Sequence, residues 1–267
     1  MSDSVYASVA AGLSEQVRDQ FPRERFHHVS ETGSTNDDLL DLIRGGTAQH
    51  LDLIVADHQS KGRGRRGDRW EASPGRNLLF SIALKLEEPR SSWPRLPHLS
   101  AYVLGGAIES VLTDDSILEA KWPNDLLFHQ QKLAGILVET VLAPKPFAVV
   151  GIGLNVNMRR DEFPEELQEE ATSLYEMQGC ESNRWFLLGE IISGFAKCHP
   201  NKLTNFSDVH EWLTKRNLLL GRRLKVKTTK GVIEGTGCGL GKDGELLIDR
   251  GNNEIEAILS AERVLFC

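Results

Sequence analysis

Four apolar segments that follow one another closely in the middle of the chain constrain its fold more than any other feature. Residues 117–122, 125–128, 133–141 and 147–157 have the length and apolar content of strands, and short polar or proline-containing breaks separate them. The break at residues 129–131 has the length of a hairpin loop. Because these segments do not alternate regularly with helices, they favour a sheet that is largely antiparallel or mixed.

Helical patterns flank this block on both sides. Val5, Val9, Leu13 and Val17 are spaced by four, which predicts a helix over residues 3–20. The other predicted elements are strands at residues 53–56 and 77–86, a helix that Ser34 or Thr35 caps, and helices at 97–112, 184–198 and 206–217. The sequence therefore predicts the α+β class, with a mixed or antiparallel central sheet and helices packed around it.

The character of the sequence changes near Gly221. From residue 222 to residue 266, short alternating apolar segments are separated by turn sequences such as residues 242–244 and 250–253. Several short strands at this spacing predict a small β-barrel of about 45 residues. We therefore expect two domains, one at residues 1–220 and one at residues 221–267.

Composition and charge exclude several classes of protein. Hydrophobic residues make up 40% of the 267 residues and charged residues 26%, which is the balance of a folded globular chain. The net charge of −7 argues against a surface that binds DNA or RNA as a whole, because phosphate binding needs a basic footprint. No apolar run approaches the roughly 20 residues that cross a bilayer, and the N-terminal residues do not resemble a secretory signal. The four cysteines show no metal-binding or disulfide spacing, so we expect reduced thiols in a cytoplasmic protein.

The strongest local signal is the decapeptide KGRGRRGDRW at residues 61–70, which we call the arginine loop. Five basic residues and one acid give this segment a charge of +4 on a chain that is negative overall. Its glycines let the backbone turn tightly, and its arginines offer paired donors to a phosphate or carboxylate. An anion-binding loop and a solvated flexible loop explain this composition equally well, and an RNA-binding segment explains it less well. The segment is not a Walker A loop, since it lacks the required Gly-Lys-Ser/Thr.

Three further segments place polar residues or glycines in or beside predicted strands. The sequence KWPND puts Asn124 and Asp125 at a strand edge, where Asp125 either binds Mg²⁺, orients an amine or only forms an Asx-turn. Lys132 begins an apolar strand and either meets an anion there or is solvated at a hairpin end. Gly135 and the glycines of GIGLNVN at residues 151–157 leave room for a flat ligand, unless they mark a β-bulge.

The order of these motifs is more specific than any one of them. STN at residues 34–36, Gln59, the arginine loop, KWPND, KLAGILVE at residues 132–139 and GIGLNVN together resemble the biotin protein ligase family over residues 30–157. The resemblance extends more weakly into the C-terminal region, where the family has an SH3-like barrel. It implies a class II synthetase-like catalytic domain that forms biotinyl-5′-adenylate from biotin and ATP, with Mg²⁺. The biotin then passes to a lysine in the biotin carboxyl carrier domain of a carboxylase.

The resemblance also implies roles for individual residues. Lys132 matches the family's catalytic lysine, and Arg65 matches the group that holds the reactive adenylate and excludes water. Asp125 is expected to orient the incoming lysine or to bind Mg²⁺. The residues implied to bind the ligands are Ser34, Thr35, Asn36 and Gln59 at the ureido ring, and Arg63 and Gly64, with Arg65, in the loop that closes over biotin and the adenylate. Trp70 is expected to cover the adenine, and Asn124 to share the role of Asp125. Gly135 is expected on the wall of the biotin pocket and Asn155 on the nucleotide side.

Two departures from the family pattern stand out. The family commonly has Arg after the last glycine of the loop, whereas this chain has Asp68 followed by Arg69. Members that double as repressors carry a winged-helix domain of about 60 residues before the STN motif. Only 33 residues precede Ser34 here, so we expect a ligase without repressor activity.

Two alternative functions are compatible with parts of this sequence. One is a lipoate or octanoate ligase of related fold, against which the arginine loop argues. The other is a biotin-responsive binding protein without catalysis, against which the retained Lys132 and loop arginines argue. A homodimer formed through sheet edges stays open at this level.

Overall fold

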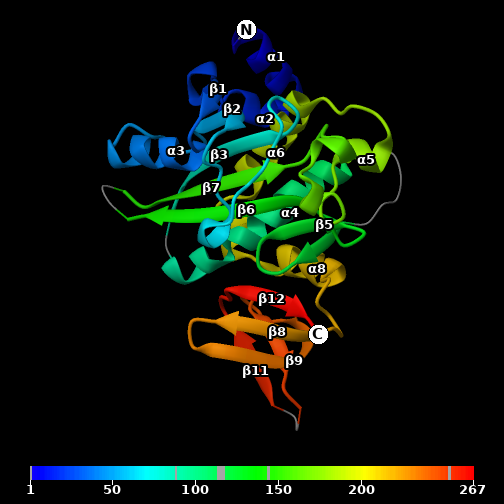
Figure 1. Cartoon of the computed structure of the whole chain (residues 1–267). Coiled ribbons are helices and arrows are strands. Elements are labelled where there is room, and N and C mark those ends of the chain that lie inside the picture. Colours follow the sequence, from blue (N-terminus) through cyan, green and yellow to red (C-terminus); the bar gives the residue numbers. More distant parts are fainter. Residues whose placement is uncertain (1, 88, 113–117, 143–144, 252–253) are drawn as a thin grey trace.

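The computed structural model describes residues 2–87, 89–112, 118–142, 145–251 and 254–267 (Figure 1). A seven-stranded sheet forms its centre, in the order β1-β2-β3-β7-β6-β5-β4. The strands are β1 Phe26–Thr32, β2 Leu53–Gln59, β3 Leu78–Lys85, β4 Glu119–Lys121, β5 Asp125–Phe128, β6 Gln131–Val141 and β7 Phe147–Leu154. β1 and β2 run parallel and the other neighbouring pairs run antiparallel, which confirms the predicted mixed sheet.

Helices cover both faces of this sheet. The α-helices are α1 Ser2–Gly12, α2 Glu15–Arg18, α3 Thr35–Arg44, α4 Leu96–Glu109, α5 Leu174–Gln178, α6 Arg184–Cys198, α7 Asn201–Thr204 and α8 Ser207–Arg216. Short 3₁₀ turns lie at Arg23–Arg25, Arg65–Gly67, Arg90–Arg95, Arg160–Glu162 and Glu165–Leu167. None of the helices in the described ranges is long and apolar enough to cross a membrane.

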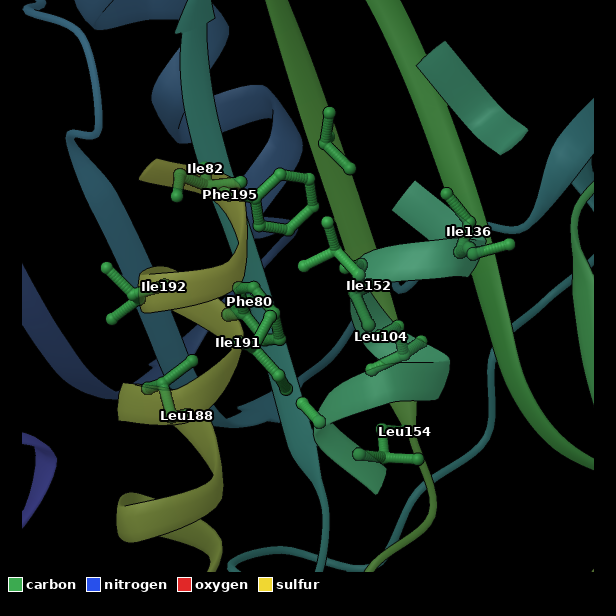
Figure 2. Packing of buried hydrophobic residues seen from close by; sticks show 14 of the residues in the cluster. Phe80, Ile82, Leu104, Ile136, Ile152, Leu154, Leu188, Ile191, Ile192 and Phe195 are labelled. Atoms are coloured by element: carbon green, nitrogen blue, oxygen red, sulfur yellow. The ribbon is translucent and has the colours of Figure 1, made fainter. Parts of the chain in front are cut away.

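The two faces of the sheet are packed differently. Figure 2 shows Phe80 of β3 and Ile152 of β7 on the face that α4 and α6 cover, together with Leu104, Ile191 and Phe195 of those helices. Successive residues of a strand point to opposite faces, so their neighbours in β3 and β7 face α3 instead. That second face, which we call the α3 face, has a smaller apolar cluster around the apolar residues of α3.

The small side chains of β6 and β7 lie on the α3 face beyond the end of α3. Gly135 is paired with Gly153, and Leu137 is paired with Gly151, in a register without a bulge. Two strands that present glycines side by side leave room above the sheet for other groups. Side chains of other segments therefore approach the sheet closely here, Asn36 at Gly151 and Trp70 at Gly153.

Most predicted elements are confirmed, with shifts at their ends. The helix predicted over residues 3–20 is interrupted between α1 and α2, and the strand predicted over 117–122 is shorter, its first residue lying outside the described ranges. The hairpin loop has two residues rather than three, since β6 begins at Gln131. His129 and Gln130 have φ values of +48° and +64°, as a two-residue type I′ turn requires.

The C-terminal strands form a second sheet that lies past α8 (Figure 1). They are β8 Arg223–Thr228, β9 Gly231–Leu240, β10 Leu246–Asp249, β11 Ile255–Ile258 and β12 Arg263–Phe266, in the order β11-β10-β9-β8-β12. No pairing joins β11 to β12 within the described residues, so the sheet is open and the closed SH3-like barrel stays a prediction. The domain boundary at residue 220 also stays a prediction.

Candidate active site

A cavity of about 430 Å³ opens on the α3 face of the sheet. Its walls come from the start of α3, the end of β2, the arginine loop, the turn between β4 and β5, strands β6 and β7, and residues 261–265 of the C-terminal region. The predicted site residues that line it are Ser34, Thr35, Asn36, Gln59, Arg63, Gly64, Arg65, Trp70, Asn124, Asp125, Lys132 and Gly135. Segments that are distant in sequence thus meet around one cavity.

A buried polar network forms one end of the cavity. The side-chain oxygen Oε1 of Gln59 accepts hydrogen bonds from the backbone N–H of Thr35 at 2.8 Å and from its hydroxyl at 3.0 Å. The Thr35 hydroxyl also lies 2.7 Å from that of Ser81, and Ser81 donates to Oδ1 of Asn36 at 2.6 Å. Thr35, Asn36 and Ser81 are at most 4% exposed, so the network is held rigidly and suits an uncharged polar ring.

Close backbone approach at Gly151 completes this end. A Cβ atom at Gly151 would lie only 2.1 Å from Oδ1 of Asn36, so the strand admits Asn36 because it has glycine there. The Nδ2 group of Asn36 donates to Oε2 of Glu139 at 2.7 Å, and Glu139 in turn lies 3.6 Å from the guanidinium of Arg63. Ser34 occupies the N-cap position of α3, but neither it nor Thr35 accepts the predicted side-chain capping bond.

A cationic region forms the other end. The ammonium group of Lys132 lies 3.0 Å from the carboxylate of Asp125, so Asp125 does more than close its own turn. The backbone of Lys132 is held on both sides, because its N–H donates to the carbonyl of Glu170 and its own carbonyl accepts from Thr172. Arg65 extends one guanidinium nitrogen toward Oδ1 of Asn124 at 3.4 Å. Basic side chains outnumber carboxylates among the described lining residues, by six to four, on a chain of net charge −7.

Trp70 fills the space above the strand glycines. A Cβ atom would lie 2.4 Å from the indole at Gly153 and 2.9 Å from it at Gly135. The ammonium of Lys132 lies 5.5 Å from the centroid of the same ring, as in a cation–π contact. The indole Nε1 is buried without a hydrogen-bond partner in the described part of the chain. The room predicted for a flat ligand is thus occupied here by the protein's own aromatic ring.

Ion pairs fasten the arginine loop at several points. Arg63 forms a close ion pair with Asp37 of α3. Asp68, where the family commonly has Arg, lies 4.0 Å from Arg263 of β12, whereas Arg69 pairs with Glu71 at 3.0 Å. Arg69 therefore forms its ion pair close by in the chain, whereas Asp68 forms one with the C-terminal sheet.

Asn155 is the one predicted site residue that the structure does not bring to the cavity. It is 4% exposed, its Oδ1 accepts from Asn77 at 3.1 Å, and its Nδ2 donates to the carbonyl of Thr172 at 3.0 Å. These bonds hold the segment after β7 in place. Asn155 therefore has a structural role in this arrangement, and its assignment to the nucleotide side stays a prediction.

Sequence reasoning missed two members of the polar network, Glu139 and Ser81, and one segment of the cavity lining. Glu139 is the last residue of KLAGILVE and lies four residues after Gly135, which places both on the α3 face of β6. Ser81 is buried on the same face of β3. Residues 261–265 come from the C-terminal region, and no local signal in the sequence places them beside the arginine loop.

Comparisons with known proteins agree with this arrangement. A family model described as the biotin/lipoate A/B protein ligase family matches residues 30–157. The bifunctional ligase/repressor BirA of Bacillus subtilis is 31% identical over 213 residues, and the match covers 79% of this chain and 65% of that protein. The biotin–[acetyl-CoA-carboxylase] ligase of Mycobacterium tuberculosis is 30% identical over 234 residues, with 85% and 84% of the two chains covered.

Solved structures extend the likeness to the whole fold. The biotin protein ligase of Aquifex aeolicus, solved in complex with biotin and ATP, matches with a TM-score of 0.76 and 30% identity. That match covers 91% of this chain and 99% of the Aquifex chain. Since relatives at this level of identity are matched over most of their own length, and the matched family segment carries most of the cavity, the chain belongs to the biotin protein ligase family.

Proposed function

We propose that the chain is an ATP-dependent biotin–protein ligase. It forms biotinyl-5′-adenylate from biotin and ATP with release of pyrophosphate, and then transfers biotin to a lysine of a biotin carboxyl carrier domain. The observation that carries this proposal is the single cavity that joins a buried uncharged polar network to a cationic region. Biotin has the same two kinds of end, a polar ureido ring and a carboxylate.

The first half-reaction brings two anions together. The biotin carboxylate attacks the α-phosphorus of ATP, and the bond from that phosphorus to the leaving pyrophosphate breaks. Lys132 is the cavity cation nearest to Gly135 of β6, where its ammonium group can contact both the carboxylate and a phosphate oxygen. Its positive charge then offsets the repulsion between the anions and stabilises the charge of the transition state.

Arg65 holds the adenylate in this account. Its guanidinium reaches Asn124 in the β4–β5 turn and the carbonyl of Ala261 in the C-terminal region, at 3.4 and 3.5 Å. The arginine loop thereby closes the cavity against two other segments, which limits the access of water to the mixed anhydride.

The second half-reaction needs a neutral amine. The acceptor lysine attacks the acyl carbon, AMP leaves with the bonding electrons, and the amine gives up a proton. Asp125 is the cavity carboxylate beside the reaction centre, since it lies next to Lys132, and we assign it the orientation of this amine. Asn124 stands beside it and fixes the turn by donating to the carbonyl of Ile136 at 2.8 Å.

Several finer points belong to the same proposal. Mg²⁺ would enter with the phosphates of ATP, because the described residues contain no cluster of three His, Cys, Asp or Glu side chains that could hold a metal. The carboxylase carrier domain as partner, the cytoplasmic location, the absence of repressor activity and a homodimer all stay predictions. So does the assignment of the fold to the class II synthetase type with an SH3-like barrel.

Biotin-dependent exchange of labelled pyrophosphate into ATP tests the first half-reaction. We expect exchange with biotin but not with lipoate or octanoate, and a loss of about 10²–10³-fold for Lys132→Ala, as when one stabilising donor is removed. Lys85→Ala, at a half-exposed lysine on the far end of β3, is the matched control and should keep full activity. Exchange that lipoate supports as well as biotin, or no exchange at all, would overturn the proposal.

A further inference from the structure

Trp122 lies between two strands of the central sheet, but its side chain packs against the C-terminal sheet. It lies in the turn between β4 and β5, two residues before Asn124. Its indole is nevertheless 5% exposed and packs into the core of the C-terminal sheet. The partners in that core are Leu219, Leu224, Val226, Leu246, Ile248, Ile258 and Ala261. The turn that lines the cavity is thus anchored in the C-terminal sheet.

The indole of Trp122 is also hydrogen-bonded to a tight turn of the C-terminal sheet. The indole N–H of Trp122 donates to the carbonyl of Gly244, in the turn between β9 and β10, at 2.9 Å. Gly244 has a φ of +88°, and a Cβ atom there would lie 2.3 Å from Cδ2 of the buried His98. Only glycine therefore combines this backbone conformation with this close approach.

The same turn is clamped by Arg95. Its guanidinium donates to the carboxylate of the adjacent Asp243, with Nε at 3.0 Å. Arg95 is itself fixed, because it also donates to the carbonyls of Leu203 and Thr204 and lies 5.0 Å from the ring centroid of Phe206. The contact between the C-terminal sheet and the main body is therefore built from directional bonds as well as apolar packing.

Asn124 and Asp125, which follow Trp122 in the β4–β5 turn, are the residues of this turn that have roles in the proposed reaction. Asn124 contacts Arg65 and the backbone of β6, and Asp125 pairs with Lys132. Only Pro123 separates Trp122 from Asn124, and its ring restricts the backbone between them. A displacement of the indole is therefore passed on to Asn124 and Asp125 rather than absorbed.

We propose that Trp122 and the turn at residues 241–245 are positioning elements of the active site, through which the seating of the C-terminal sheet sets the places of Asn124, Asp125 and Lys132. This inference rests on the proposed function, because it concerns the rate of the reaction in the same cavity. Trp122 borders the cavity, but its indole packs into the core of the C-terminal sheet, and Gly244 lies outside the cavity lining. Their effect is on the geometry of the groups that take part in the reaction, to which rates are sensitive.

The test compares two glycine substitutions in the full-length chain. Gly244→Ala forces the turn away from His98, whereas Gly251→Ala imposes a similar strain at a φ of +90° with open space around the new Cβ atom. We expect kcat for biotin-dependent pyrophosphate exchange to fall by about 10- to 100-fold in Gly244→Ala, as for displacements of up to about 1 Å. Gly251→Ala should keep the wild-type kcat, and the KM for biotin should stay within about twofold in both, because the network around Gln59 is not displaced.

A second substitution covers the case in which Gly244→Ala does not fold. Trp122→Phe keeps an aromatic ring in the core and removes only the bond to Gly244, so it should lower kcat less than Gly244→Ala while leaving the KM for biotin unchanged. Equal loss of kcat in both glycine variants, or a wild-type kcat in folded Trp122→Phe, overturns the inference. A wild-type protein without biotin-dependent exchange would overturn the proposed function itself, so the two failures are distinguishable.

Discussion

Replacing Thr35 with Val tests whether the buried network at the polar end of the cavity is built for a ligand. Thr35 is 3% exposed and Ser81 is fully buried, and their hydroxyls lie 2.7 Å apart. Ser81 donates its hydrogen to Asn36, so the oxygens of Ser81 and Gln59 share the single hydroxyl hydrogen of Thr35. Valine has nearly the same shape as threonine but no hydroxyl, so the network loses this shared hydrogen while the packing is preserved. Gln59 then keeps only the bond from the backbone N–H of residue 35, and Ser81 keeps only its bond to Asn36.

The size of the effect follows from these bonds. The loss of one buried hydrogen bond costs about 0.5–1.5 kcal/mol, which for a chain of this size lowers the Tm by roughly 1–6 °C. The affinity for biotin should fall as well, by about 5- to 30-fold if 1–2 kcal/mol of binding free energy is lost. Thermal unfolding and calorimetric titration with biotin measure the two quantities separately.

Thr35→Ser provides the matched control, because it keeps the hydroxyl and loses only a methyl group. We expect Thr35→Ser to bind biotin nearly as the wild type does. The reasoning is refuted if Thr35→Val binds biotin with wild-type affinity, or if Thr35→Ser is damaged as much as Thr35→Val. Either result would mean that the hydroxyl takes no part in recognition.

Two further predictions concern the loop and the dependence of stability on pH. Arg65→Gly should release the adenylate, so that unrelated proteins become biotinylated in solution. Arg44→Gly, which removes an exposed ion pair with Asp41 outside the cavity, should not; streptavidin blotting of a bystander protein distinguishes them. Burial, together with the nearby His50, lowers the pKa of His199 from 6.5 to about 4. Between these pH values the unfolded chain binds more protons than the folded chain, so the free energy of unfolding falls as the pH drops from 6.5 to 4. The ring nitrogens of His199 have no hydrogen-bond partner in the described residues, so His199→Phe should unfold at the wild-type temperature at pH 8 and show a shallower loss of Tm between pH 6.5 and 4.5; an unchanged slope would contradict this.

The sequence predicted the residues of the site better than their arrangement. Lys132, Gly135 and Gln59 were predicted because each stands at a fixed place in an ordered set of motifs, and all three line the cavity. Ser81 and Glu139 were not, because their roles depend on which face of a strand they occupy, and that is decided only when the register of the sheet is known. Two polar residues on the same strand can therefore have unrelated functions.

Asn155 is the predicted site residue that does not line the cavity. An asparagine at the end of a strand suits a ligand contact and an internal hydrogen bond equally well, and here both its amide nitrogen and its oxygen are used inside the protein. The parallel strand β1 was missed because Phe26 is the one residue in it that is fully buried, so the strand has little apolar pattern. Long-range packing, such as that of Trp122 with the C-terminal sheet, gives no signal in the neighbouring sequence.

Transfer of biotin to a carrier domain is the direct test of the proposed ligase activity. The purified chain is incubated with biotin, ATP, Mg²⁺ and the biotin carboxyl carrier domain of a carboxylase, and the carrier is analysed by intact-mass spectrometry. We expect one biotinyl group on one lysine, none when ATP is omitted, and none with Lys132→Ala over the same time. A carrier domain that stays unmodified here, while a known biotin ligase modifies it in a parallel reaction, would contradict the account.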